Sequence, residues 1–480
     1  MSTAPVASAE SASTRRQWVA WLRPSSVEDD YEIREVEGEI PRELFGTLYR
    51  NGPSQKQLPP AGYEALHLFD GDGYVHAFRF EDGQAFYRSR FVRDETYLAE
   101  EKEGRYCMDG LNVKAENPLE GVGRVQHNTN IVSHAGRLFA LVENGMPFEL
   151  DPQTLEPLGT FDLGGRAVGL STSAHPKTDG RTGEMVIHGY QPVEPFASLY
   201  VLDAAGNVTL AETVDTPWPG MMHDLAITQE HVILPLGPVV FDVNVMAEGG
   251  VFRDAVSWQP ERGLKFGIRS REPGSPMRWF DAPTAGYLFH PGNAYEEDGV
   301  IYMDACTYLD GENFLPELCT ARSGAYGSGL VAHPFLYEFD LATGECRERQ
   351  LSDRSAEFPR IDERLIGYKN RFGYAAIGNP ATRDDAAGIW TDLARYDRTG
   401  APSVYRQLPA GHYTGEPVFV PRHADAPEED GFVLAMVYDA PNDRSGLLIL
   451  DAQDLAGEAL ATLWLRDRVP AGFHGNFVAA

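Results

Sequence analysis

Four histidines are the residues of this chain best suited to chemistry: His175, His223, His290 and His474. Each is flanked by small or apolar residues, which suits an imidazole held inside a protein better than one in solvent. They form no HxH or HxxxH pair, so no single strand or helix can bring two of them to one ion. If they meet, the whole fold must bring them together.

The elements that must position these histidines are short strands. From about residue 31 onward, apolar or alternating runs recur between turn signals, and few stretches hold a helical period. The runs at 147–151, 198–203, 336–340 and 446–451 each end in Asp and lead into a turn and another strand. Repeats of this kind at intervals of tens of residues are typical of β-propeller blades. The sequence therefore predicts an all-β protein.

The chain is expected to form one propeller domain over residues 31–480, preceded by a flexible segment, 1–30. No Gly/Ser-rich linker divides the chain after residue 31. The longer irregular stretches 244–283 and 310–334 are interpreted as insertions on one face. The two tryptophans in 18–22 leave two alternatives open, a helix docked on the body or a helix lying on a membrane surface.

Charge and hydropathy exclude some partners. The formal net charge of −30 opposes the phosphate backbone, so nucleic acid is not an expected partner. No run approaches the 18 or more apolar residues of a transmembrane helix. We expect a cytoplasmic protein, with a peripheral position on the inner face of the membrane left open; its oligomeric state is not predicted.

A propeller would give the four histidines a way to meet, because residues from several blades can point at one spot on the axis. Four neutral imidazoles without thiolates suit a borderline divalent metal, namely iron, copper, nickel or zinc. The ligand set by itself does not choose among them.

Nine short motifs in family order resemble the carotenoid cleavage oxygenase family over nearly the whole chain. They lie at residues 46–53, 69–73 with His76 shortly after, 128–130, 173–176, 221–228, 289–291, 357–360, 416–422 and 472–475. The resemblance implies a seven-bladed β-propeller with a dome of loops and helices over the iron-bearing axis. It implies a non-haem Fe(II) held by the four histidines.

The resemblance also assigns roles to residues around the iron. Glu143, Glu357 and Glu416 match the glutamates that orient three of the four histidines, since a carboxylate accepting the distal N–H fixes the tautomer and raises ligand basicity. Thr129 matches a position close to an open iron site and is expected to limit access there. An ordinary inward strand residue is an equal alternative for Thr129.

The implied activity is oxidative cleavage of a conjugated carbon–carbon double bond by O2, giving two carbonyl products. Phenol-cleaving relatives carry a lysine just before the glutamate matched by Glu143, whereas this chain has Val142, which cannot hold a phenolate. We therefore predict a hydrophobic carotenoid or apocarotenoid substrate, contacted by Phe69, Val142 and Phe289. Cleavage of phenolic stilbenes or phenylpropanoids is the alternative. A non-catalytic propeller and an isomerohydrolase also stay open.

Overall fold

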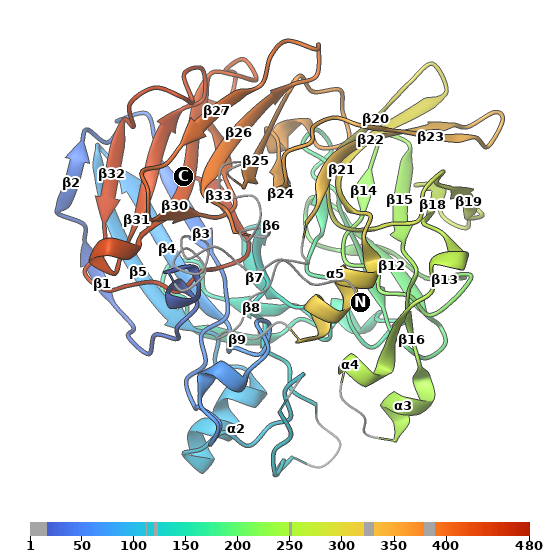
Figure 1. Cartoon of the computed structure of the whole chain (residues 1–480), viewed down its shortest axis with the longest axis horizontal. Helices are drawn as coiled ribbons and strands as arrows, with labels where there is room; N and C mark the ends of the chain where they lie inside the picture. The colour runs from blue at the N-terminus through green and yellow to red at the C-terminus, as the bar shows by residue number, and fades with distance from the viewer. Residues whose placement is uncertain (1–16, 112, 120–122, 249–251, 321–330, 379–388) are drawn as a thin grey trace, which may run out of the picture.

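The computed structural model describes residues 17–480 except for 112, 120–122, 249–251, 321–330 and 379–388. Within these residues, strands form seven sheets of four to six strands, which are arranged as the blades of a propeller, and one further two-stranded sheet (Figure 1). First strands of successive blades contact one another around the axis, for example β14 (Ala226–Ile227) with β20 (Tyr287–Glu297). The predicted seven-bladed propeller is confirmed.

The blades follow one another in chain order, and neighbouring strands within each blade are antiparallel. The first three blades consist of β33 (Gly475–Ala479), β3 (Gly46–Arg50), β4 (Tyr74–Glu81), β5 (Gln84–Phe91) and β1 (Asp30–Glu32); β6 (Asn130–His134), β7 (Arg137–Leu141), β8 (Phe148–Leu150) and β9 (Pro157–Thr160); and β10 (Lys177–Thr178), β11 (Met185–Tyr190), β12 (Ala197–Leu202) and β13 (Val208–Val214).

The remaining four blades complete the ring, with the small sheet of β16 (Val239–Phe241) and β17 (Val256–Trp258) beside them. They consist of β14, β15 (His231–Leu236), β18 (Lys265–Ser270) and β19 (Arg278–Asp281); β20, β21 (Val300–Tyr308), β22 (His333–Asp340) and β23 (Cys346–Gln350); β24 (Ala356–Arg360), β25 (Phe372–Ile377), β26 (Asp392–Asp397) and β27 (Val404–Gln407); and β28 (His412–Thr414), β29 (Val418–Pro421), β30 (Gly431–Asp439), β31 (Arg444–Asp451), β32 (Ala461–Trp464) and β2 (Glu35–Gly38).

The two ends of the chain close the ring together. The C-terminal β33 is the innermost strand of the first blade and pairs with β3, with Gly475 opposite Arg50. The N-terminal β2 is the outermost strand of the last blade, with Glu35 opposite Trp464. Because strands from both ends share blades, the closed ring leaves only short sheet edges.

The recurring strand-end aspartates have a common local role. Asp151 Oδ1 accepts hydrogen bonds from the backbone N–H groups of Gln153 and Thr154. Asp340 Oδ1 accepts from Ala342 and Thr343 in the same way. An Asp side chain that binds the backbone two and three residues ahead stabilises a tight turn. The repeated Asp at strand ends therefore marks the turns that join neighbouring strands of a blade.

The prediction that 244–283 is an insertion is partly wrong. Its second half supplies β18 and β19, the outer half of the fourth blade, and β18 pairs with β15 along its length. The first half holds two short helices, α3 (Val243–Ala247) and α4 (Phe252–Ala255), which adjoin each other (Figure 1). The stretch 310–334 contains α5 (Gly311–Thr320), while 321–330 lie outside the described residues.

Helix α5 covers the end of the propeller that carries the histidines. Its Phe314 ring lies 5.7 Å from the ring of Phe289, which directly precedes His290. Its Leu318 carbonyl is 2.6 Å from His67 Nε2, which ties the helix to the long loop after β3. The other long helix, α2 (Glu95–Glu103), is capped by Asp94, whose side chain accepts from the Tyr97 N–H.

The N-terminal tryptophans are part of the body. Trp21 is 2% exposed, stacks on Tyr438 with ring centroids 5.6 Å apart, and donates its indole N–H to the Val469 carbonyl. Trp18 is also buried, edge-on to Tyr413. These two rings are therefore not free to enter a bilayer, whereas residues 1–16 lie outside the described part of the chain. No helix among the described residues is long and apolar enough to span a membrane.

The buried His76 on β4 should make the folded protein less stable as the pH falls. Its Nδ1 is 2.7 Å from Tyr87 Oη, and burial, followed by nearby Arg50, lowers its pKa to about 3. Below pH about 6.5 the unfolded chain binds a proton that the folded chain does not, so stability decreases as pH falls. We expect His76 to lower the free energy of unfolding by about 1.5 kcal/mol between pH 6.5 and pH 5.

Urea unfolding of the wild-type protein and His76→Gln at several pH values measures this contribution. The variant should lose less stability on acidification than the wild type, since the other buried histidines titrate in both proteins. Parallel pH profiles for the two proteins would contradict the assignment.

Candidate metal centre

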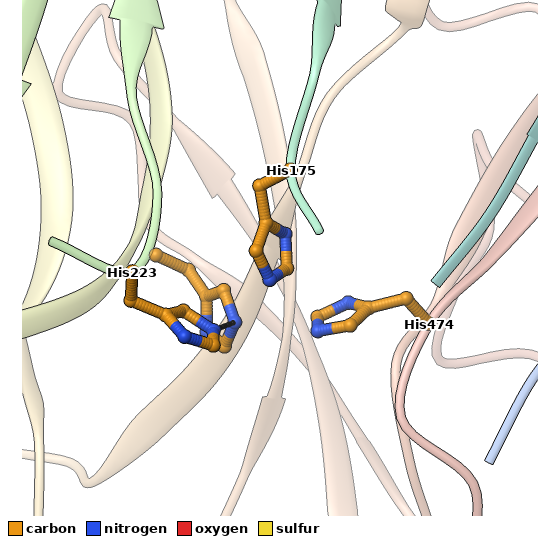
Figure 2. A group of neighbouring side chains, drawn as sticks. His175, His223 and His474 are labelled. Atoms are coloured by element: carbon orange, nitrogen blue, oxygen red, sulfur yellow. Dashed lines mark hydrogen bonds between the residues drawn. The ribbon is translucent and has the colours of Figure 1, made fainter. Parts of the chain in front are cut away.

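The structure brings the four histidines together near the propeller axis. His175, His223 and His474 each come shortly before the first strand of a blade, and His290 lies within one. One nitrogen of each ring lies within 4.8 Å of one nitrogen of every other, and all four residues are buried. Figure 2 shows the rings of His175, His223 and His474 converging from three different parts of the fold. The predicted convergence of the four histidines is therefore found.

The ring nitrogens have the arrangement of a ligand set. His175 Nε2 is buried and has no hydrogen-bond partner within the described part of the chain. His223 Nε2 and His290 Nε2 are 3.2 Å apart. Because both Nδ1 atoms face carboxylates, each of these two Nε2 atoms would carry a lone pair instead of a proton. The two lone pairs would repel each other, and a cation bound by both nitrogens would remove this repulsion. Two imidazole nitrogens about 2.1 Å from a metal and at right angles would lie about 3.0 Å apart.

Each predicted glutamate lies against a different histidine. Glu357 Oε2 is 2.6 Å from His290 Nδ1, and Glu416 Oε1 is 2.8 Å from His474 Nδ1. The carboxylate of Glu143 contacts His223 Nδ1. A carboxylate at Nδ1 leaves Nε2 as the lone-pair atom, so all three rings present the same nitrogen to the centre.

Hydrogen-bond donors hold the glutamates in turn. Tyr190 donates its hydroxyl to Glu143, and Tyr308 donates to Glu357 Oε1 at 3.0 Å. Burial and the adjacent Glu143 charge raise the pKa of Tyr190 well above its usual value, so this hydroxyl stays a donor. Sequence reasoning missed both tyrosines, because a tyrosine in a strand is usually an ordinary core residue.

Two arginines, the buried Arg50 and the partly buried Arg360, hold the third glutamate. Arg50 Nη1 and Arg360 Nη1 donate to Glu416 at 3.0 and 2.7 Å. Burial alone would raise the pKa of the Glu416 carboxyl, but Arg360, His474 and Arg50 lower it below its usual range. Both arginines lie inside motifs that carried the family resemblance, and that was the only sequence signal for them.

A β-bulge in β24 aims two of these side chains inward. The pairing with β25 shifts between Glu357 and Arg360, and Phe358 has a φ of 55°. Residues three apart on a regular strand face opposite sides, so the extra residue lets both Glu357 and Arg360 reach the axis. The Phe358 ring lies 5.5 Å from the ring of His290 and 5.3 Å from that of His474. Strained residues of this kind concentrate at functional sites.

His175 is the exception among the four histidines. Its nearest carboxylate oxygen is Asp224 Oδ2, at 3.9 Å from Nδ1, too far for a direct hydrogen bond. Asp224 is itself engaged by Lys177 Nζ at 2.8 Å. Burial and the three neighbouring histidines lower the pKa of His175 well below its usual value, which keeps the ring neutral.

A hollow of about 710 Å3, counted with its open mouth and lined by both polar and apolar residues, adjoins the centre. It is lined by His175, His290 and His474, with Lys177 and Glu363 among its charged residues. The residues that we predicted to contact substrate are not among those around it.

The predicted substrate contacts lie elsewhere around the histidines. The ring of Phe289 is 4.7 Å from that of His223, and the ring of Phe69 is 5.4 Å from that of Phe473. Val142 is buried. The Thr129 hydroxyl donates to Asn128 Oδ1 at 3.1 Å, just before β6, and not to any of the four histidines. Their roles toward substrate and oxygen stay predictions.

Fold and site together define a β-propeller with a buried four-histidine centre. The family model described as RPE65, retinal pigment epithelial membrane protein, matches residues 22–479. Isoeugenol monooxygenase of Pseudomonas putida is 35% identical over 96% of this chain and 97% of its own length. Apocarotenoid-15,15'-oxygenase of Synechocystis is 31% identical over 96% of both chains. The chain therefore belongs to the RPE65 and carotenoid cleavage oxygenase family, a family of oxidoreductases.

A solved structure supports the same conclusion. The crystal structure of cobalt-substituted Synechocystis ACO aligns with a TM-score of 0.88 and 29% identity, covering 97% of this chain and 98% of that one. The substituted cobalt marks that relative as a metal-binding protein. The four-histidine centre described above is the matching candidate in this chain.

Proposed function

We propose that His175, His223, His290 and His474 hold Fe(II), and that Glu143, Glu357 and Glu416 fix the tautomers of three of them. The observation that carries the proposal is the cluster of four buried histidines, three with a carboxylate at Nδ1. Neutral nitrogen ligands without thiolates suit iron, and four of them leave two positions of an octahedron open.

The proposed reaction is cleavage of a conjugated carbon–carbon double bond by O2. Iron(II) held by these residues would supply the activation of dioxygen. The two alkene carbons each receive one oxygen atom, the bond between them breaks, and two carbonyl products form with no net gain or loss of protons. The chain therefore needs no general acid or base, and its own residues bind, orient and shield the alkene.

Apolar side chains beside the histidines support an apolar substrate. Phe289 packs edge-on to His223 at 4.7 Å, and α5 covers it through Phe314. Phe69 meets Phe473 next to His474. We propose that Phe69, Val142 and Phe289 contact the substrate and that Thr129 limits access to one open iron position.

A carotenoid or apocarotenoid is the proposed substrate class. Val142, directly before Glu143, is buried and apolar, and valine can neither donate a hydrogen bond to a phenolate nor offset its charge. The second candidate is a phenolic stilbene or phenylpropanoid. It is favoured by the 35% identity to a relative named for isoeugenol.

A side-by-side assay of the Fe(II)-loaded protein distinguishes the two classes. We expect cleavage of an apocarotenal or a carotenoid, with both atoms of ¹⁸O₂ recovered in the two products, and little turnover of resveratrol or isoeugenol. Turnover of the phenolics alone would overturn the proposed substrate. Products without label from ¹⁸O₂ would overturn the oxygenase reaction and point to isomerohydrolase chemistry.

A matched variant tests the role of Val142. Val142→Lys introduces a cation beside the site, and we expect it to decrease polyene cleavage by about tenfold or more, since an unpaired buried charge is costly. Val142→Met, which keeps an apolar side chain, is the control. Equal activity of the two variants on the polyene would contradict a substrate contact at this position.

A further inference from the structure

Two arginines, one buried and one partly buried, flank the pair of His474 and Glu416. Arg50 is 3% exposed, and its Nη1 donates to Glu416 Oε2 at 3.0 Å. On the other side, Arg360 Nη1 donates to Glu416 Oε1, the oxygen that also faces His474 Nδ1. Both carboxylate oxygens of Glu416 are thus fixed by guanidinium groups, whose rigid planar geometry suits this purpose.

The other two histidine–glutamate pairs are built differently. Glu143 and Glu357 receive a tyrosine hydroxyl, from Tyr190 and Tyr308 respectively. A neutral hydroxyl orients a carboxylate without neutralising it. Two cations at Glu416 are therefore more than tautomer control alone requires, since neutral donors suffice at the other pairs.

The same arginines also bind the backbone that carries His474. Arg50 Nη2 donates to the Phe473 carbonyl at 3.1 Å, and Arg360 Nη1 donates to the Gly475 carbonyl at 2.9 Å. Arg360 Nη2 donates to Asn476 Oδ1 at 2.9 Å. The residue on each side of His474 is therefore held by a guanidinium group.

On its N-terminal side, His474 has no strand of its own to hold it. Residues 465–474 belong to no strand, so His474 ends a long irregular segment and meets a sheet only at Gly475. Arg50 ends β3, and Arg360 ends β24 after the bulge. Two different blades thus hold the irregular end of this segment against the axis.

We propose that Arg50 and Arg360 are positioning residues for His474: together they fix Glu416 and residues 473–476, so that the last histidine meets the metal in register with the other three. The inference rests on the proposed metal site. It predicts that loss of either guanidinium group weakens metal binding although all four histidines and all three glutamates are still present.

The test compares Arg50→Met and Arg360→Met with Arg269→Met. Arg269, on the outer strand β18, has a side chain 4% exposed and donates to Glu212 at 2.7 Å, so it matches the loss of a buried arginine far from the axis. Each metal-stripped protein is titrated with Co(II), and the visible absorption of bound Co(II) and the metal-induced rise in Tm are recorded. Tighter binding gives a larger rise at a given Co(II) concentration.

We expect the two site variants to bind Co(II) about tenfold more weakly, with altered visible bands, because supporting partners of metal ligands commonly contribute this much. Arg269→Met should lower the Tm of the metal-free protein but keep wild-type affinity and bands. Unchanged affinity and bands in both site variants would overturn the positioning role while leaving the metal site intact. If the wild-type protein bound no Co(II), the proposed metal site and this inference would both be wrong.

Arg50→Lys and Arg360→Lys keep the inference testable if the methionine variants do not fold. Lysine keeps the positive charge beside Glu416. Its single ammonium group cannot bind both the carboxylate and a backbone carbonyl in the way that the planar guanidinium fork of arginine does. We expect folded proteins with Co(II) affinity between wild type and the methionine variants, and with shifted bands. Wild-type bands and affinity in both lysine variants would contradict the role of the fork.

Discussion

Replacing His290 by alanine is expected to abolish turnover and to lower metal affinity by more than about a hundredfold. The change removes one of four ligand nitrogens, and loss of a ligand should exceed the tenfold to hundredfold effect of losing a supporting partner. It also leaves the buried carboxylate of Glu357 without its imidazole partner. Metal content of the purified protein and the rate of alkene cleavage measure the two effects separately.

His231→Ala is the matched control for this change. His231 Nδ1 lies 2.8 Å from Glu296 Oε2, so it forms the same kind of histidine–carboxylate pair, but on the second strand of its blade and away from the axis. The control variant should keep its metal and its activity. Wild-type activity in His290→Ala would disprove the site, and equal losses in both variants would indicate a general effect on folding.

Glu357→Gln is expected to reduce metal affinity or activity by about tenfold to a hundredfold. The carboxylate accepts from His290, from the Tyr308 hydroxyl and from the backbone N–H of Phe358. An amide has one accepting oxygen, and its NH2 group would face at least one of these donors. His290 would therefore lose both its fixed orientation and the negative charge that raises its basicity.

The control for the glutamate is Glu296→Gln, which breaks the corresponding pair with His231. Metal titration and steady-state rates of both variants should distinguish an effect on the metal site from the loss of a partly buried histidine–carboxylate pair. Tyr308→Phe adds a finer comparison, since it removes one donor to Glu357 but keeps the charge, and we expect a smaller loss than in Glu357→Gln. A Glu357→Gln protein with full metal affinity and activity would show that this carboxylate does not support a ligand.

Part of the fold could be predicted because its signals are local. The turns after strand-end Asp residues could be predicted, because each Asp binds the backbone only two or three residues ahead, as Asp151 does. Strands β18 and β19 were not predicted, because Lys265–Ser270 has only two alternating apolar residues, Phe266 and Ile268, and the two apolar residues of Arg278–Asp281 are adjacent. Their strand character comes from pairing with β15, which no local pattern reveals.

By itself the sequence determined the types of group available: four histidines in apolar contexts, three glutamates that match the family, and strands separated by tight turns. Only the tertiary structure decided which partners hold them. Tyr190, Tyr308, Arg50 and Arg360 come from four different blades, and their roles depend on hydrogen bonds between residues distant in the chain. The physical reason is that the type of a residue determines which bonds its side chain can form. The folding of the blades into a closed ring determines which other side chains lie close enough to form them.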